Sequence, residues 1–231
     1  MKEAVWHGVE PAAEARRSTL TAGSVSRISG LALVAGCAIS AVFRIVANLF
    51  FGSTTDYANQ PIFIASEFVL AAATVLLLLG LPGVFAARAQ GFGLIGLFGV
   101  ALVFTESIMV GIFANLWGAM ADPWLATVAP SLANGFGPPP LFAYYNIAEV
   151  ALVVGSILLA IPVLRGRVSP KWPAAVLVLS VVIGAVFFFW IPSLPPTLVP
   201  SLLATIPDIL LWIALAGFGY QAYAKAPPLG D

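Results

Sequence analysis

Four acidic residues and one arginine stand inside stretches that are otherwise almost entirely apolar. They are Arg44, Glu67, Glu106, Glu149 and Asp208. A charged side chain at the centre of a bilayer costs about 2.5–3.5 kcal/mol on insertion scales, so such residues normally face the interior of a helix bundle and mark ion or proton pathways. These residues are therefore the candidates for binding a proton, a cation or a small polar or cationic solute.

Further polar residues accompany these charges at helical spacing. Asn48 follows Arg44 by four residues. Tyr145 and Asn146 precede Glu149 by four and three residues. Because residues three or four apart share a helix face, these side chains are expected to line the same site as the charges beside them.

The charges within these stretches do not balance. One arginine cannot neutralise four carboxylates, and Glu67, at a similar depth on the next predicted helix, is the favoured partner of Arg44. The remaining acids are then expected to hold protons part of the time or to bind a cation. Buried ion pairs and protonated acids also join helices, so a purely structural role is the alternative.

The elements that position these residues follow from the hydropathy of the chain. Hydrophobic residues make up 61% of the 231 residues and charged residues 9%, too few polar groups to cover a water-soluble protein. A membrane-spanning helix needs about 20 apolar residues. The sequence predicts an all-α bundle of six transmembrane helices between polar tails at 1–27 and 224–231, with spans at 28–51, 62–87, 92–117, 140–164, 172–191 and 199–223.

Basic residues predict how the bundle is oriented. They occur in both tails and in the connections after the second and fourth spans, whereas the other three connections have none. By the positive-inside rule, both termini are expected in the cytoplasm. Counting 1.5 Å per residue from the outer ends of the spans places the charged residues about 10–15 Å deep. The sequence thus predicts a polar pocket that opens outward above an apolar inner half.

The longest outer connection, 118–139, contains a second helix signal. Asp122-Pro123-Trp124 has the pattern of a helix start, and Asn134-Gly135 has that of a helix stop. The segment between them is apolar, which predicts a short interfacial or re-entrant helix. An irregular loop is the alternative.

Two further features are best explained by helix packing. Gly93, Gly96 and Gly99 recur every third residue, which leaves one face of the third span open to close approach by another helix. Cys37 follows small residues that resemble the box before a lipidated cysteine. However, the 27 mostly polar residues before the first span and the apolar residues after Cys37 are unlike a lipoprotein signal. A cysteine packed between helices is the favoured interpretation.

The residue inventory excludes several functional classes. The only histidine is His7, in the N-terminal tail, and Cys37 is the only cysteine, so haem, zinc and iron–sulfur sites lack their usual ligands. Proteases that use histidine lack one within a span, and an aspartyl dyad would have only Asp208. Zero net charge and the lack of a basic face argue against nucleic acid. We therefore expect no cofactor, no metal and no enzyme activity, with acid catalysis on a lipid by glutamates as the least favoured alternative.

Residues 80–102, GLPGVFAARAQGFGLIGLFGVAL, carry a resemblance to a known group. They resemble small bacterial inner-membrane proteins with six spans and no characterised function, in which the second span ends in a Gly-Leu-x-Gly-[Tyr/Phe]-x-Ala-Arg-like turn. The similarity extends over most of the chain. It implies the six-helix fold and a bacterial inner membrane, and it transfers no catalytic residue.

Two functions are favoured by this sequence over an intramembrane enzyme. The first is a small transporter-like protein whose acidic pocket opens outward to a proton, a cation or a small polar solute. The second is a non-transporting accessory or lipid-binding subunit, in an oligomer or with a partner subunit, whose buried polar layer holds its helices in register. The lipid bilayer surrounds the protein in both cases.

Overall fold

The chain folds into packed α-helices in a computed structural model that describes residues 22–51, 57–86, 88–130, 139–166, 168, 170–190 and 198–225. A short 3₁₀-helix, Tyr57–Asn59, precedes α2, and a π-helical segment, Ser107–Ala114, joins α3 to α4. The α-helices are α1 (Ala22–Phe51), α2 (Pro61–Ala86), α3 (Ala89–Glu106), α4 (Asn115–Val128), α5 (Pro139–Leu164), α6 (Trp172–Trp190) and α7 (Leu198–Lys225).

Four of the predicted spans match α2, α5, α6 and α7 to within two residues. The first predicted span is too short, because α1 is already helical at Ala22, six residues earlier. These residues pack against the end of α7: Ser26 Oγ donates a hydrogen bond to the Ala222 carbonyl at 3.2 Å, and Arg27 lies over the Tyr223 ring at 5.6 Å. Residues 22–27 therefore belong to the bundle and not to the polar tail.

The third predicted span is also too short. The helix that begins with α3 continues through the π-helical segment and α4, giving an apolar run of 40 residues from Ala89 to Val128. At 1.5 Å per residue the part of this run that follows the kink at Gly93 is about 50 Å long, well over the thickness of a bilayer core.

The prediction that a separate helix starts at Asp122 is wrong. Asp122 and Pro123 lie inside α4, which begins at Asn115. The intervening sequence, NLWGAMA, holds one glycine and no proline, so nothing ends the helix before Asp122. The predicted stop at Asn134-Gly135 lies outside the described residues.

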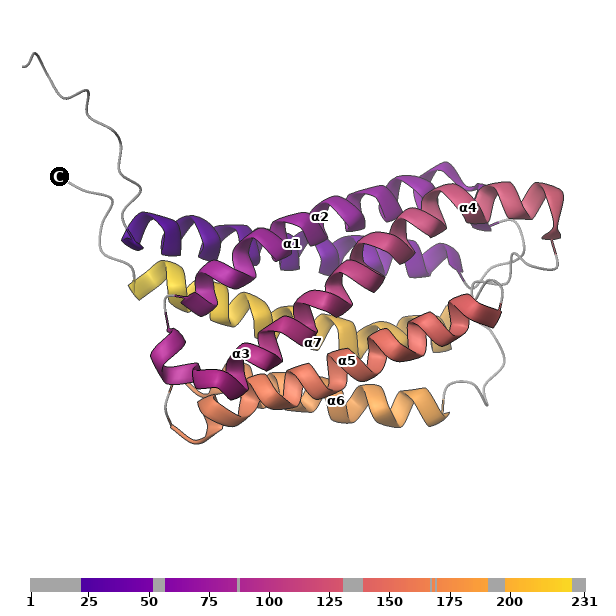
Figure 1. Ribbon diagram of the computed structural model, residues 1–231. Helices are drawn as coiled ribbons and strands as arrows, with labels where there is room; N and C mark the ends of the chain where they lie inside the picture. Colours follow the sequence, from indigo (N-terminus) through magenta and orange to yellow (C-terminus); the bar gives the residue numbers. More distant parts are fainter. Residues whose placement is uncertain are drawn as a thin grey trace, which may run out of the picture.

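The helices pack in a closed ring. Helix α1 packs between α2 and α7, and α6 packs between α5 and α7. The long helix closes the ring diagonally, with α3 against α5 and α4 against α2 (Figure 1). This crossing places the π-helical segment near the middle of the bundle.

The surface of the bundle is apolar. Leu79, Leu94 and Ile147, on three different helices, are 66%, 74% and 63% exposed. Among the described residues, five helical runs are long and apolar enough to cross a membrane, and Trp172–Phe187 forms a shorter apolar helix. A surface of this kind is stable in lipid and not in water, so the chain is an integral membrane protein.

Basic residues gather at one end of the bundle, which we call the basic end. The start of α1 and the end of α7 lie there, together with the α2–α3 and α5–α6 connections (Figure 1). Arg88 Nη1 donates to Gln221 Oε1 at 2.7 Å, and burial lowers the pKa of the Arg88 guanidinium. Apart from Arg44, every arginine and lysine that the structure describes lies at this end, as the helix bounds and the contact of Arg27 with Tyr223 show: Arg27, Arg88, Arg165, Lys171 and Lys225.

The predicted close approach of helices is confirmed at one glycine of the three. A Cβ atom on Gly99 would lie 2.6 Å from the Leu159 nitrogen and 2.8 Å from the Gly155 carbonyl oxygen of α5. Gly93 instead has a positive φ of 60°, which interrupts the regular helix, and Gly96 faces Phe92 of its own helix. Of the three glycines, Gly99 therefore allows a close contact between helices and Gly93 produces a kink.

Cys37 occupies the packing position that the sequence favoured. It is 1% exposed and lies in the main apolar cluster with Leu33 and Leu77. This cluster also includes Leu211 and Leu215, which together with Leu77 line the cavity described next. The polar site is thus bounded on one side by the apolar core.

Candidate functional site: two polar cavities around Arg44

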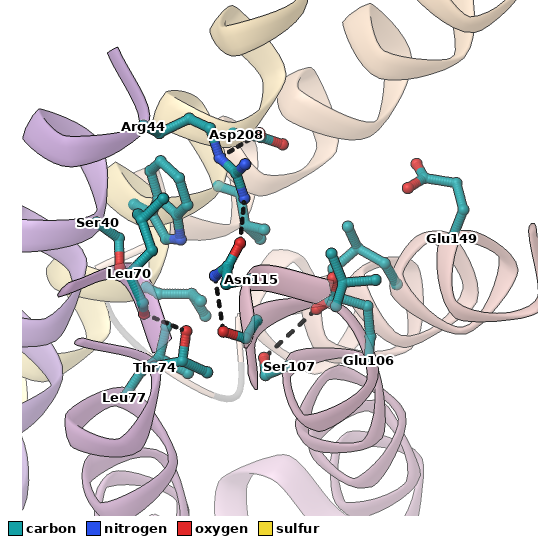
Figure 2. Close-up of a pocket in the computed structure, with 16 residues that line it drawn as sticks. Ser40, Arg44, Leu70, Thr74, Leu77, Glu106, Ser107, Asn115, Glu149 and Asp208 are labelled. Carbon is teal, nitrogen blue, oxygen red and sulfur yellow. Dashed lines mark hydrogen bonds and ion pairs between the residues drawn. The ribbon is translucent and has the colours of Figure 1, made fainter. Parts of the chain in front are cut away.

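A cavity of about 100 Å³ lies inside the ring of helices, and we call it the inner cavity (Figure 2). Its charged residues come from four separate helices: Arg44 of α1, Glu106 of α3, Glu149 of α5 and Asp208 of α7. The structure therefore brings together four of the five charged residues that the sequence singled out.

A second cavity of about 250 Å³, the outer cavity, adjoins the first. Arg44, Val110 and Asn115 line both cavities. The outer cavity lies toward the end of the bundle opposite the basic end. It holds three of the four remaining predicted residues, Glu67, Asn48 and Tyr145, together with Asp122. Arg44 thus stands where the two cavities meet.

Arg44 pairs with Asp208. Its Nε lies 3.8 Å from Asp208 Oδ2, and its Nη2 donates to Asn115 Oδ1 at 3.4 Å, which links α1 to α7 and α4. The predicted pair of Arg44 with Glu67 is therefore wrong. Equal depth does not fix which way a side chain faces, and Glu67 faces α4: a Cβ atom on Gly118 would lie 3.3 Å from Glu67 Oε2.

The other two acids of the inner cavity are set apart from the arginine (Figure 2). The Glu106 carboxyl accepts a hydrogen bond from Ser107 Oγ at 3.4 Å, the only one that reaches it within the described residues. Glu149 is exposed at the edge of the cavity. Neither carboxylate is thus held by a cation or by a hydrogen bond from another described helix.

The π-helical segment shapes the wall of both cavities. It begins directly after Glu106, and the wider turn leaves carbonyl groups that side chains must satisfy. Asn115 Nδ2 donates to the Gly111 carbonyl at 2.7 Å, and the Tyr144 hydroxyl donates to the Met109 carbonyl at 2.9 Å. Such segments occur frequently at functional sites. Nothing in the local sequence marked this one.

Asp122 was missed as a site residue because its Asp-Pro-Trp context resembles a helix start. It lies in the outer cavity, where Trp117 Nε1 donates to Asp122 Oδ1 at 3.0 Å. The signal that could have found it is its spacing: Asn115, Gly118 and Asp122 follow one another at three and four residues, which is one helix face.

One predicted residue stays apart from the others. Asn146 lines neither the inner nor the outer cavity, although it lies on the same helix as Glu149 and Tyr145. Its spacing of three residues from Glu149 predicted a position on the same helix face. Of Tyr145 and Asn146, however, only Tyr145 lines a cavity.

The part of the chain that the structure describes has no group of three or more histidine, cysteine, aspartate or glutamate side chains that could hold a metal ion. Comparison with protein-family models, with curated proteins and with solved structures finds no match to this chain. The cavities and their charges therefore carry the functional argument.

Proposed function

We propose that the protein is a small transporter of the bacterial inner membrane that binds a proton or a small cation in its two polar cavities. One observation carries this proposal: five carboxyl groups and one guanidinium line two adjoining cavities among the described residues. Asp208 is the only one of these acids that pairs with Arg44 there. A cation site needs such an excess of negative charge. Acidic side chains at this depth in a membrane are costly, and those that occur there commonly mark functional sites.

The proposed orientation places both termini in the cytoplasm. The positive-inside rule supports it, because the basic end would face the cytoplasm and the outer cavity would face the opposite side. A cation would then enter past Asp122 and Glu67, reach Arg44 and Asp208, and continue to Glu106 and Glu149. Competition between the cation and Arg44 for Asp208 would couple binding to a rearrangement between α1 and α7.

A flux assay on purified, reconstituted protein tests this proposal. Vesicles loaded with a pH-sensitive or a cation-sensitive dye are given an imposed gradient of protons, sodium or guanidinium. We expect flux of one of these cations well above that of protein-free vesicles. Wild-type flux that equals the protein-free background for all three would count against transport.

A structural role is the second candidate, and the Arg44 contacts favour it. Arg44 joins α1 to α7 through Asp208 and to α4 through Asn115, which is what a residue that fixes helix register would do. In an accessory subunit of this kind, neutralising the acids would lower the melting temperature, and no cation would shift it. The two candidates therefore differ in what Glu106 does, since Glu106 makes no such contact between described helices.

A further inference from the structure

A third cavity, the side chamber, adjoins the inner cavity between α5, α6 and α7. Its volume is about 30 Å³. Glu149 and Asp208 line both the side chamber and the inner cavity, and Ser156 and Ser180 supply hydroxyl groups to the side chamber. The remaining walls are mostly apolar.

The hydroxyl groups of the side chamber can still form hydrogen bonds. Ser156 is 0% exposed, and its Oγ has no hydrogen-bond partner among the described residues. Ser180 Oγ donates to the Pro207 carbonyl at 2.8 Å, which leaves its lone pairs able to accept. A buried hydroxyl without a hydrogen-bond partner is unfavourable. The Ser156 hydroxyl would therefore be stabilised by a ligand that accepts a hydrogen bond from it.

Water fits this chamber in both size and chemistry. A cavity needs on the order of 10–15 Å³ of accessible volume for each water molecule, together with two to four polar partners. A water molecule here can accept from the Ser156 hydroxyl and donate to Ser180 Oγ and to a carboxylate. A bare cation would leave the Ser156 proton without an acceptor, and a hydrated cation is larger than the chamber.

We infer that the side chamber holds water that connects Glu149 to Asp208, and that the cation exchanged at this site is the proton. This inference rests on the proposed transport function and names its substrate. In each transfer the protonated carboxyl loses its O–H bond as the water gains one, and the water gives another of its protons to the second carboxylate. The water is unchanged, and one carboxyl and one carboxylate have exchanged roles.

Two substitutions in the side chamber test this inference in the vesicle assay. A Cβ atom on Gly184 would meet Pro207 Cβ and Cγ at 3.5 and 3.9 Å, ordinary contact distances, so Gly184→Ala fits and places a methyl group against the chamber wall. We expect it to lower proton flux by about a hundredfold, the range that a proton-transfer group contributes. Ser156→Ala removes one partner of the water and is expected to lower proton flux by about tenfold.

Ser66→Ala is the matched control. Ser66 is 1% exposed like Ser156, but its Oγ donates to the Ile62 carbonyl at 2.7 Å, and it lines none of the three cavities. We expect wild-type proton flux and an unchanged melting temperature. If Gly184→Ala does not yield folded protein, Ser156→Ala decides the matter against the same control.

The outcomes separate this inference from the proposed function. Proton flux that falls in both chamber variants and not in Ser66→Ala supports the inference. Wild-type proton flux in the chamber variants overturns it, as does a wild-type protein that carries sodium or guanidinium but not protons, and both results leave a transporter in place. A wild-type protein without flux of any cation overturns the proposed function and the inference together.

Discussion

Arg44→Gln is expected to lower the free energy of unfolding by about 2 kcal/mol, somewhat less than the loss of one partner from a fully buried ion pair. The Arg44 side chain is 21% exposed and that of Asp208 is 42% exposed, so water or lipid headgroups partly compensate for the lost charge. The substitution removes the only basic side chain of the two cavities within the described residues and leaves their acids to repel one another. Thermal unfolding in detergent measures the change. Arg165→Gln, at the basic end, serves as the control and should unfold like the wild type.

A double-mutant cycle identifies the partner of Arg44. Combining Arg44→Gln with Asp208→Asn is expected to cost less than the sum of the two single substitutions, by about 0.5–3 kcal/mol, because the residues are in contact. The cycle of Arg44→Gln with Glu67→Gln should be closer to additive, since Glu67 faces α4. A larger coupling to Glu67 than to Asp208 would show that the sequence-based pairing was right and the observed geometry wrong.

Gly99→Leu is expected to destabilise the bundle by about 3 kcal/mol or more. The first carbon of the new side chain would lie 2.6 Å from a backbone nitrogen and 2.8 Å from a backbone oxygen of α5, and backbone atoms cannot move aside as side chains can. Helices α3 and α5 would have to separate. Thermal unfolding measures the loss, and Gly184→Ala is the control, because its added carbon meets only ordinary contacts. A Gly99→Leu protein that melts with the control would rule out the close α3–α5 contact.

The helical bundle could be predicted from the sequence because a bilayer imposes its own length on apolar segments. The predicted ends of α2, α5, α6 and α7 were correct to within two residues. The two misjudged spans have one cause. Hydropathy marks where a helix enters lipid, but it does not mark where a helix ends in polar surroundings. Residues 22–27 include two serines and an arginine yet are helical against α7, and α4 continues through Asp122 and Pro123.

The composition of the site was more predictable than its geometry. Charge in apolar segments identified Arg44, Glu106, Glu149 and Asp208, and all four line the inner cavity. The pairing was not predictable, because depth along a span says nothing about rotation about the helix axis. The π-helical segment was not predictable either, since it depends on the Asn115 and Tyr144 side chains that satisfy its carbonyl groups. Asp122 was not predicted as a site residue, because its Asp-Pro-Trp context is also the pattern of a helix start.

Glu106→Gln is the substitution that separates a transport site from a structural one. The only hydrogen bond to the Glu106 carboxyl within the described residues comes from Ser107, its neighbour in the chain, so its charge joins no helices there. Thr105→Val is the matched control, because Thr105 is exposed, precedes Glu106 directly and donates only to the Ala101 carbonyl of its own helix at 2.9 Å.

Melting temperature and flux of the cation that the wild-type protein carries, measured on the same Glu106→Gln and Thr105→Val preparations, test the central claim most directly. If the inner cavity carries a cation, Glu106→Gln lowers the flux by about a hundredfold and melts with Thr105→Val. A Glu106→Gln protein with wild-type flux and a lowered melting temperature would contradict this account and assign the acid to the structure of the bundle.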